Sequence, residues 1–273
     1  MHVNQCMDFS STTQLCLTSF LEYGVRAEYP EYPDFCVLYI WSFVDYFSKI
    51  QVLLQSNPLY DLSDDGWNNW HTFRAFQLLT FWCGLSYEIR NRNFIEIDNS
   101  FIVVANHQTL LDVLTLTHVW PENCVVLLKS SLKFMPGFNV CAYLCEAIFI
   151  DRFNKAASHK SVEQAICAVR NYRKIWIFPE GTRNTSGTML PFKKGAFIIA
   201  RAANVPIVPV VISSYQSFYC KDEYKFDYGG RVIIEILPAI DPFAYSDIDS
   251  MSEECHKQME NVYRKISNEL YSK

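Results

Sequence analysis

A histidine and an aspartate five positions apart, His107 and Asp112, are the first side chains in this sequence that could do chemistry together. His107 follows the apolar run FIVVA, so we expect it in the turn after a strand, where its side chain can face a ligand. Five residues along a helix rotate by about 140°, so the two side chains meet only if His107 precedes a helix and Asp112 lies in its first turns. The aspartate would then fix the imidazole tautomer and leave the other ring nitrogen as a proton acceptor. Taken alone, the spacing is explained more simply by a helix-capping histidine and a solvent-facing aspartate.

The second group is the segment FPEGTRN, residues 178–184, which follows the apolar run IWIF. Pro179 and Gly181 favour a tight turn, and Thr182 offers a hydroxyl. The guanidinium of Arg183 suits a phosphate, and backbone amides in such a turn can form an anion-binding concavity. Taken alone, the segment is equally consistent with an ordinary exposed turn whose arginine lies in water.

Short apolar runs that alternate with helical stretches must position these two turns. The expected strands are residues 94–97, 101–105, 124–128, 147–150, 175–178, 207–212 and 231–237, the last of which completes the sheet. The expected helices are residues 70–87, 110–120, 156–172, 195–203 and 252–271. This alternation predicts an α/β fold with a mostly parallel twisted sheet flanked by helices, in which ligands bind beyond the carboxyl ends of the strands.

An N-terminal helical region, residues 1–69, is expected to precede an α/β domain at residues 70–273, because the turn-forming segment 56–69 separates them. The start of the chain lacks the features of a signal peptide. The apolar stretches 35–44 and 75–87 are both shorter than the roughly 20 residues of a bilayer span. They fit two interpretations equally well, as helices of the core or as membrane-associating helices that lie in one leaflet.

The composition favours contact with lipid and argues against nucleic acid as a partner. Apolar residues make up 50% of the 273 residues and charged residues 19%, below the roughly 25% of ordinary soluble chains, although an aromatic-rich soluble enzyme would look similar. The net charge of −5 does not suit a phosphate backbone, while a local basic pocket could still hold a small anion. The ten cysteines lack the paired spacings of a zinc site, so we expect no metal and mostly buried thiols in a reducing compartment.

Four motifs, in this order, make the sequence resemble the glycerophospholipid acyltransferase superfamily, and specifically the 1-acylglycerol-3-phosphate (lysophosphatidic acid) acyltransferases. The motifs are N-H-x4-D at residues 106–112, F-I-D-R at 149–152, F-P-E-G-T-R at 178–183 and V-P-I-V-P at 205–209. The segments MLPFKKGAF at 189–197 and SSYQSFYCK at 213–221 also resemble the animal branch of that family. The resemblance covers residues 70–238.

The resemblance implies roles for individual residues. His107 and Asp112 would be the catalytic positions, the first as the base and the second as its orienting partner. The implied substrate-binding positions gather around the acceptor and its phosphate: Lys129, Arg152, Glu180, Gly181, Thr182 and Arg183. For Lys193 and Lys194, a solvated basic pair explains the sequence nearly as well as a role near the CoA phosphates.

The function that the resemblance implies is acyl-CoA-dependent conversion of lysophosphatidate to phosphatidate, with acyl-CoA as co-substrate and no bound cofactor. The implied partners are these two substrates and a membrane lipid surface. The implied location is the endoplasmic reticulum membrane, with the site facing the cytosol. The glycosylation sequon Asn184-Thr185-Ser186 lies in the expected phosphate site, so we predict that it is unmodified.

Three alternatives remain open at this point. The chain could acylate glycerol-3-phosphate or another lysophospholipid. It could be an acyl-CoA thioesterase in which His107 activates water. It could also be a lipid-binding protein without turnover.

Overall fold

The computed structural model describes residues 77–78, 81–134, 142, 146–151, 155–220, 223 and 225–272. The predictions for residues 1–69 and for Arg152 fall outside the described residues. The proposed division of the chain near residue 69 therefore stays a prediction.

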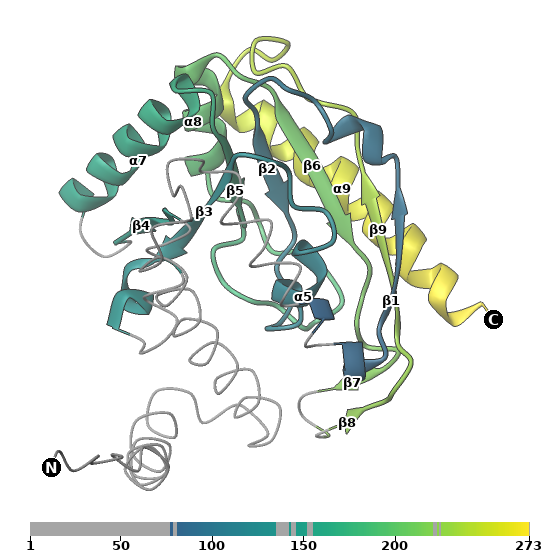
Figure 1. Cartoon of the computed structure of the whole chain (residues 1–273). Helices are drawn as coiled ribbons and strands as arrows, with labels where there is room; N and C mark the ends of the chain where they lie inside the picture. The colour runs from purple at the N-terminus through teal and green to yellow at the C-terminus, as the bar shows by residue number, and fades with distance from the viewer. Residues whose placement is uncertain are drawn as a thin grey trace, which may run out of the picture.

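A seven-stranded sheet with the order β1-β9-β6-β2-β5-β3-β4 forms the centre of the described structure (Figure 1). Its strands are β1 (Ser86–Arg90), β2 (Ile102–Ala105), β3 (Cys124–Lys129), β4 (Ile148–Ile150), β5 (Lys174–Ile177), β6 (Ile207–Ile212) and β9 (Arg231–Ile236). Neighbouring strands pair in parallel except β6 and β9, which are antiparallel. Helices flank the sheet, so the expected α/β fold with a mostly parallel sheet is confirmed. A separate hairpin joins β7 (Tyr219–Cys220) to β8 (Lys225–Phe226).

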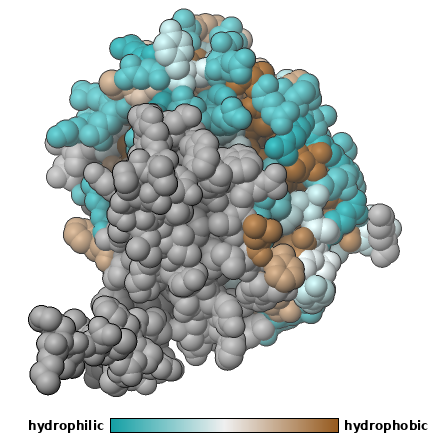
Figure 2. Space-filling view, viewed as in Figure 1, coloured by the Kyte–Doolittle hydropathy of each residue, from teal (hydrophilic) through white to brown (hydrophobic). Residues whose placement is uncertain are grey.

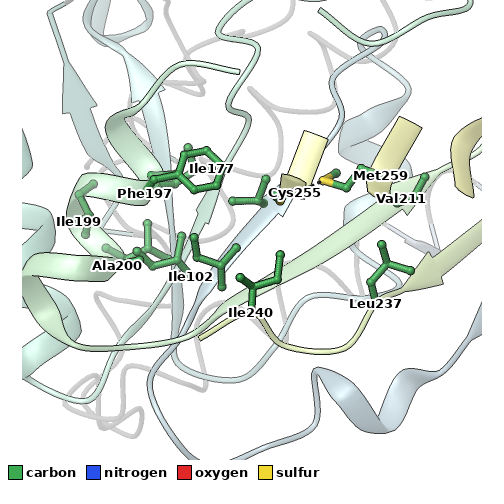
Figure 3. Close-up of a cluster of buried hydrophobic side chains, with 14 of the residues drawn as sticks. Ile102, Ile177, Phe197, Ile199, Ala200, Val211, Leu237, Ile240, Cys255 and Met259 are labelled. Carbon is green, nitrogen blue, oxygen red and sulfur yellow. Dashed lines mark hydrogen bonds between the residues drawn. The ribbon is translucent and has the colours of Figure 1, made fainter. Parts of the chain in front are cut away.

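The central strand β2 is buried on both sides, as strands of a parallel sheet usually are. Ile102 and Val104 face a cluster that includes helices α7 (Lys155–Arg170), α8 (Gly195–Ala203) and α9 (Ile248–Tyr271). Figure 3 shows this cluster, in which Cys255 and Met259 of α9 are fully buried. Each large apolar side chain that is buried in this way contributes about 1.5–3 kcal/mol.

The opposite face of the sheet packs against the short helix α5 (Asp112–Leu116) and several loops. Val103 and Ala105 of β2 point into this second cluster, together with Trp176 of β5. The alternation of side chains along β2 therefore divides the core into two layers.

Three predicted elements near the start of the described chain differ from the structure. The helix expected at 70–87 does not reach its predicted end, because the short 3-10 helix η2 (Phe81–Cys83) ends before Gly84, whose φ of 64° belongs to the left-handed region, and β1 follows. Residues 94–97 do not form a strand, because the 3-10 turn η3 (Arg92–Phe94) follows the left-handed Asn91. The helix expected at 110–120 is only Asp112–Leu116.

The remaining predicted strands and helices agree with the structure to within a few residues at their ends. Strand β9 differs in its place, because it lies between β1 and β6 and β1 forms the edge of the sheet. A further 3-10 turn, η4 (Ser130–Phe134), follows β3.

The surface of the described part is mostly hydrophilic in the view of Figure 2, with apolar side chains in small groups. Exposed large apolar side chains include Leu78, Phe81, Phe134 and Tyr228. Among the residues that the structure describes, no helix combines the length and apolar character that crossing a bilayer requires.

Candidate active site

The two motif-bearing turns follow neighbouring parallel strands. β2 ends at Ala105 and leads into His107, and β5 ends at Ile177 and leads into the 178–184 turn. Because β2 and β5 pair in parallel, both turns emerge at the carboxyl edge of the sheet, where α/β proteins bind ligands. The topology therefore brings together segments that are more than 70 residues apart in the sequence.

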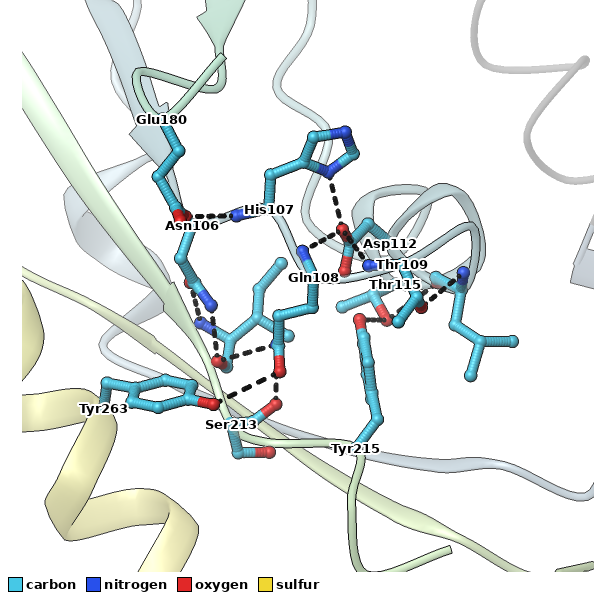
Figure 4. Close-up of polar contacts among 12 residues, drawn as sticks. Asn106, His107, Gln108, Thr109, Asp112, Thr115, Glu180, Ser213, Tyr215 and Tyr263 are labelled. Carbon is cyan, nitrogen blue, oxygen red and sulfur yellow. Dashed lines mark hydrogen bonds and ion pairs between the residues drawn. The ribbon is translucent and has the colours of Figure 1, made fainter. Parts of the chain in front are cut away.

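His107 and Asp112 form a hydrogen-bonded pair (Figure 4). The distance from His107 Nδ1 to Asp112 Oδ2 is 2.7 Å. The Asp112 side chain is 1% exposed and the His107 side chain 25% exposed. A carboxylate can only accept, so Nδ1 carries the proton and Nε2 is left as the basic nitrogen of the neutral ring.

Local backbone geometry explains why Asp112 reaches back to the imidazole. Asp112 is the first residue of α5, and its Oδ2 also accepts the backbone amides of Gln108 at 2.7 Å and Thr109 at 3.0 Å. The carboxylate thus holds the turn that carries His107, much as an N-terminal capping side chain holds a helix start. The arrangement expected from the sequence, a histidine before the helix and an aspartate in its first turn, is the one that forms.

The backbone of His107 is bonded to the second turn through both of its polar groups. Its amide donates to Glu180 Oε1 at 2.8 Å, and its carbonyl accepts the amide of Asn184 at 2.9 Å. The other oxygen of Glu180 accepts the amide of Leu190 at 2.9 Å. Burial raises the pKa of Glu180 above its usual range. Glu180 therefore ties the turns together instead of facing solvent.

The ring of His107 also stacks on Phe178, with ring centroids 4.1 Å apart and planes inclined by 21°. Phe178 in turn meets the edge of the buried Trp176, at 6.2 Å between centroids. An aromatic face against an imidazole holds the plane of its ring. The sequence offered no sign of this contact beyond the presence of Phe178 next to the motif.

The backbone conformation at position 181 favours glycine. Its φ is 72°, and a Cβ at this position would lie 2.7 Å from Nζ of Lys193 and 2.9 Å from its Cε. The Lys193 side chain thus lies across the turn, with its own amide donating to Pro179 O at 2.9 Å. This places a cation beside the predicted phosphate site.

The other predicted site residues that the structure describes lie at the same edge of the sheet. Thr182 is exposed and Arg183 half-buried, within the turn that contacts His107. Lys129 is exposed at the carboxyl end of β3, which pairs with β5. No hydrogen bond joins Lys129 to His107 or Glu180 in the described part of the chain.

Buried amides that sequence analysis missed fasten the His107 turn to the strand on its other side. Asn106 donates to the carbonyl of Ile212 at 2.9 Å and accepts its amide at 2.8 Å. Gln108 donates to the carbonyl of Ser213 at 2.9 Å and accepts the hydroxyl of Tyr263 at 3.4 Å. These pairs span more than 100 residues, so spacing in the sequence could not reveal them.

The geometry supplies a positioned base next to a turn with cationic side chains. Within the described residues, no group of three or more His, Cys, Asp or Glu side chains is arranged to hold a metal ion. Such an arrangement suits removal of a proton from a hydroxyl whose molecule also carries an anionic group.

Comparison with known proteins agrees with this geometry. The sequence family described as Acyltransferase matches residues 86–213, from β1 to just past β6. The Caenorhabditis elegans protein named "Putative 1-acyl-sn-glycerol-3-phosphate acyltransferase acl-1" is 45% identical over 203 residues, which cover 74% of this chain and 77% of that protein. The human 1-acyl-sn-glycerol-3-phosphate acyltransferase beta is 38% identical over 190 residues, 68% of each chain.

A solved structure has the same architecture. The crystal structure of the 1-acyl-sn-glycerophosphate (LPA) acyltransferase PlsC from Thermotoga maritima aligns with a TM-score of 0.58 and 25% sequence identity. The alignment covers 96% of this chain and 98% of that chain. Sequence and fold therefore confirm the resemblance, and the chain belongs to the 1-acyl-sn-glycerol-3-phosphate (LPA) acyltransferase family.

Proposed function

We propose that this chain transfers the acyl group of acyl-CoA to the free hydroxyl of 1-acyl-sn-glycerol-3-phosphate, giving phosphatidate and CoA. The observation that carries the proposal is the 2.7 Å contact between His107 Nδ1 and Asp112 Oδ2, next to the turn that contains Arg183. It gives a part-exposed imidazole whose Nε2 can accept a proton, beside a cationic group that can hold a phosphate.

The chemistry needs one base and no covalent enzyme intermediate, because a thioester is already activated. The acceptor hydroxyl gives its proton to Nε2 of His107 as its oxygen bonds to the thioester carbonyl carbon. The carbon–sulfur bond then breaks, and the imidazolium returns the proton to the CoA sulfur. Asp112 stabilises the imidazolium while it exists.

The acceptor phosphate is assigned to the 178–184 turn and its surroundings. Arg183 offers a fork of N–H donors, and Lys193 lies across Gly181. Because Gly181 has no side chain, the phosphate can approach its backbone closely. Because Glu180 is buried and bonded to two backbone amides, its charge is turned away from the phosphate.

We further propose that the enzyme works on a membrane surface of the endoplasmic reticulum, with the site facing the cytosol. Both substrates carry long acyl chains, which favours reaction at a lipid surface. The side-chain amide of Asn184 donates to the carbonyl of Thr188, and its oxygen accepts the amide of Ser186 at 3.0 Å. Because Asn184 lies in the turn assigned to the phosphate, where a glycan would block the site, we expect it to be unmodified; a mass loss on glycosidase treatment would contradict this orientation.

An acceptor panel tests the proposed function. The purified protein is given an acyl-CoA with lysophosphatidate, with glycerol-3-phosphate, with lysophosphatidylcholine or with no acceptor. Released CoA thiol and acylated product are both measured. The proposal expects thiol release that depends on lysophosphatidate and equals the phosphatidate formed. Equal release without acceptor would identify a thioesterase, and product from another acceptor alone would change the assigned substrate.

A further inference from the structure

The second carboxylate oxygen of Asp112 is a feature that the reaction above does not explain. Oδ2 accepts hydrogen bonds from His107, Gln108 and Thr109. Oδ1 is buried and accepts none from the described residues. Leaving one oxygen of a buried carboxylate without a donor is costly. The groups beside Oδ1 therefore influence how the charge of Asp112 acts on His107.

Two buried hydroxyls lie behind this oxygen. Thr115 comes three residues after Asp112 on α5, so the two side chains share a face of the helix. The Thr115 hydroxyl lies 2.8 Å from the hydroxyl of Tyr215, a residue that is 2% exposed. Figure 4 shows the Tyr215 hydroxyl directed toward Thr115 and the Asp112 carboxylate. Burial, and next the charge of Asp112, raise the pKa of Tyr215 well above 10, so its hydroxyl keeps its proton at neutral pH.

The two hydroxyl protons have two self-consistent arrangements. In one, Thr115 donates to the carbonyl of Leu111 and Tyr215 donates to Thr115. The Leu111 contact is 3.3 Å, long for an O–H···O bond, which is usually about 2.7–2.8 Å. In the other, Thr115 donates to Tyr215, and the tyrosine proton is free to point at Asp112. The second arrangement places a hydroxyl donor beside Oδ1 of Asp112, which otherwise accepts no hydrogen bond from the described residues.

We propose that Tyr215 is a positioning residue of this site, whose hydroxyl, polarised by Thr115, faces Asp112 and moderates the negative charge that the carboxylate presents to His107. The inference rests on the proposed function, in which His107 is the base. Tyr215 lies in the SSYQSFYCK segment, far from both motif-bearing turns in the sequence. Without its hydroxyl, the uncompensated charge of Asp112 should hold the proton on His107 more strongly, so that the base becomes available only at higher pH.

The test is the acidic limb of kcat/KM against pH, which reports the ionisation of the base in the free enzyme. In the described part of the chain, the other titratable groups that face the pair are Glu180, from the 178–184 turn, and Tyr87, from β1; both are unchanged in every variant. Tyr215→Phe is expected to move the limb upward by roughly 0.5 to 1 pH unit. Tyr263→Phe is the matched control, because Tyr263 is also buried but its hydroxyl contacts Gln108 and not Asp112; its limb should stay at the wild-type pH.

Thr115→Val is the second variant. It tests the proposal if urea titration shows that Tyr215→Phe does not fold. It removes the hydroxyl that polarises Tyr215, so a smaller upward shift is expected. The other proton arrangement expects a downward shift, because the tyrosine proton would be released toward Asp112. An unchanged or lowered limb in a folded Tyr215→Phe protein, or in Thr115→Val, overturns the proposal. The proposed function itself fails if CoA release by the wild-type protein does not depend on lysophosphatidate; if His107→Ala keeps the wild-type rate of acceptor-dependent release, the assignment of His107 as the base fails, whatever Tyr215→Phe does.

Discussion

The amide of His107 donates a 2.8 Å hydrogen bond to the carboxylate of Glu180, a residue 73 positions away. This bond fixes the distance between the proposed base and the proposed phosphate-binding turn. Glu180, which belongs to the second motif, thus holds the backbone of the histidine in the first motif. The acceptor hydroxyl and its phosphate need such a fixed separation, because proximity and orientation contribute much of the acceleration in bimolecular transfer.

Glu180→Gln should loosen this connection. The amide side chain keeps one acceptor but turns an NH2 group toward a backbone N–H donor. A buried donor without a partner costs about 1–3 kcal/mol, so we expect a loss of that size in the free energy of unfolding, with lower activity. Urea titration and steady-state rates measure the two effects. A variant as stable and active as the wild type would show that the bond is dispensable.

The raised pKa of Glu180 predicts that the stability of the fold depends on pH. Because burial raises the pKa of Glu180 above 4.5, the folded state binds its proton more tightly than the unfolded state does. The stability of the wild type relative to Glu180→Gln should therefore fall as the pH rises from about 4.5 through the raised pKa, and level off above it. Urea titrations of both proteins at several pH values test the sign; a relative gain in stability over this window would contradict it.

Gly181→Ala should disturb the phosphate turn. The left-handed φ of 72° disfavours a Cβ, although the flexible end of Lys193 can move aside, and such backbone strain costs about 1–3 kcal/mol. We expect lower stability and a raised KM for lysophosphatidate. Gly195→Ala is the matched control, since nothing lies within 4 Å of its Cβ position and alanine favours a helix start over glycine. Equal effects of the two substitutions would show that the turn is tolerant.

Arg183→Ala should weaken binding of the acceptor more than it slows the chemical step. A charge-assisted hydrogen bond is worth about 1.5–3 kcal/mol, which corresponds to a roughly 10- to 150-fold rise in KM. The defect should shrink for an acylglycerol acceptor that lacks the phosphate. Equal losses for the two acceptors would indicate a structural role for Arg183.

Much of the fold could be predicted because its central strands are buried on both sides. A short, continuous apolar run such as Ile207–Ile212 is typical of a strand that is buried on both faces, and this run forms a strand with the expected limits. Ser86–Arg90 is not predicted as a strand because its first two residues fall within the expected helix 70–87, although SYEIR alternates polar and apolar residues as a half-buried strand does. It is a strand because it pairs with β9 and because ion pairs join Arg90 to Glu88 and Glu269, contacts that only the tertiary structure provides.

The side chains of the candidate site could be predicted from the sequence, but the hydrogen bonds that hold them in place could not. His107 and Asp112 lie close together in the sequence, and the spacing alone indicated how they could meet. Residues 94–97 were misassigned because the apolar side chain of Ile95, 2% exposed, packs into the core without strand pairing. The bonds of Gln108 to Ser213 and of Thr115 to Tyr215 join segments about 100 residues apart. No local pattern marks such pairs, because their geometry is set by the packing of whole strands and helices.

The most direct measurement is the rate of CoA thiol release by His107→Ala with acyl-CoA and lysophosphatidate, compared with the wild-type protein at equal folded concentration. Loss of a general base costs about 10²- to 10⁴-fold in rate. For His107→Ala we expect a fall in kcat of that size with phosphatidate formation lost in parallel, while the folded structure and the urea midpoint remain near wild type. A His107→Ala protein that still makes phosphatidate at the wild-type rate would contradict the assignment of His107 as the base.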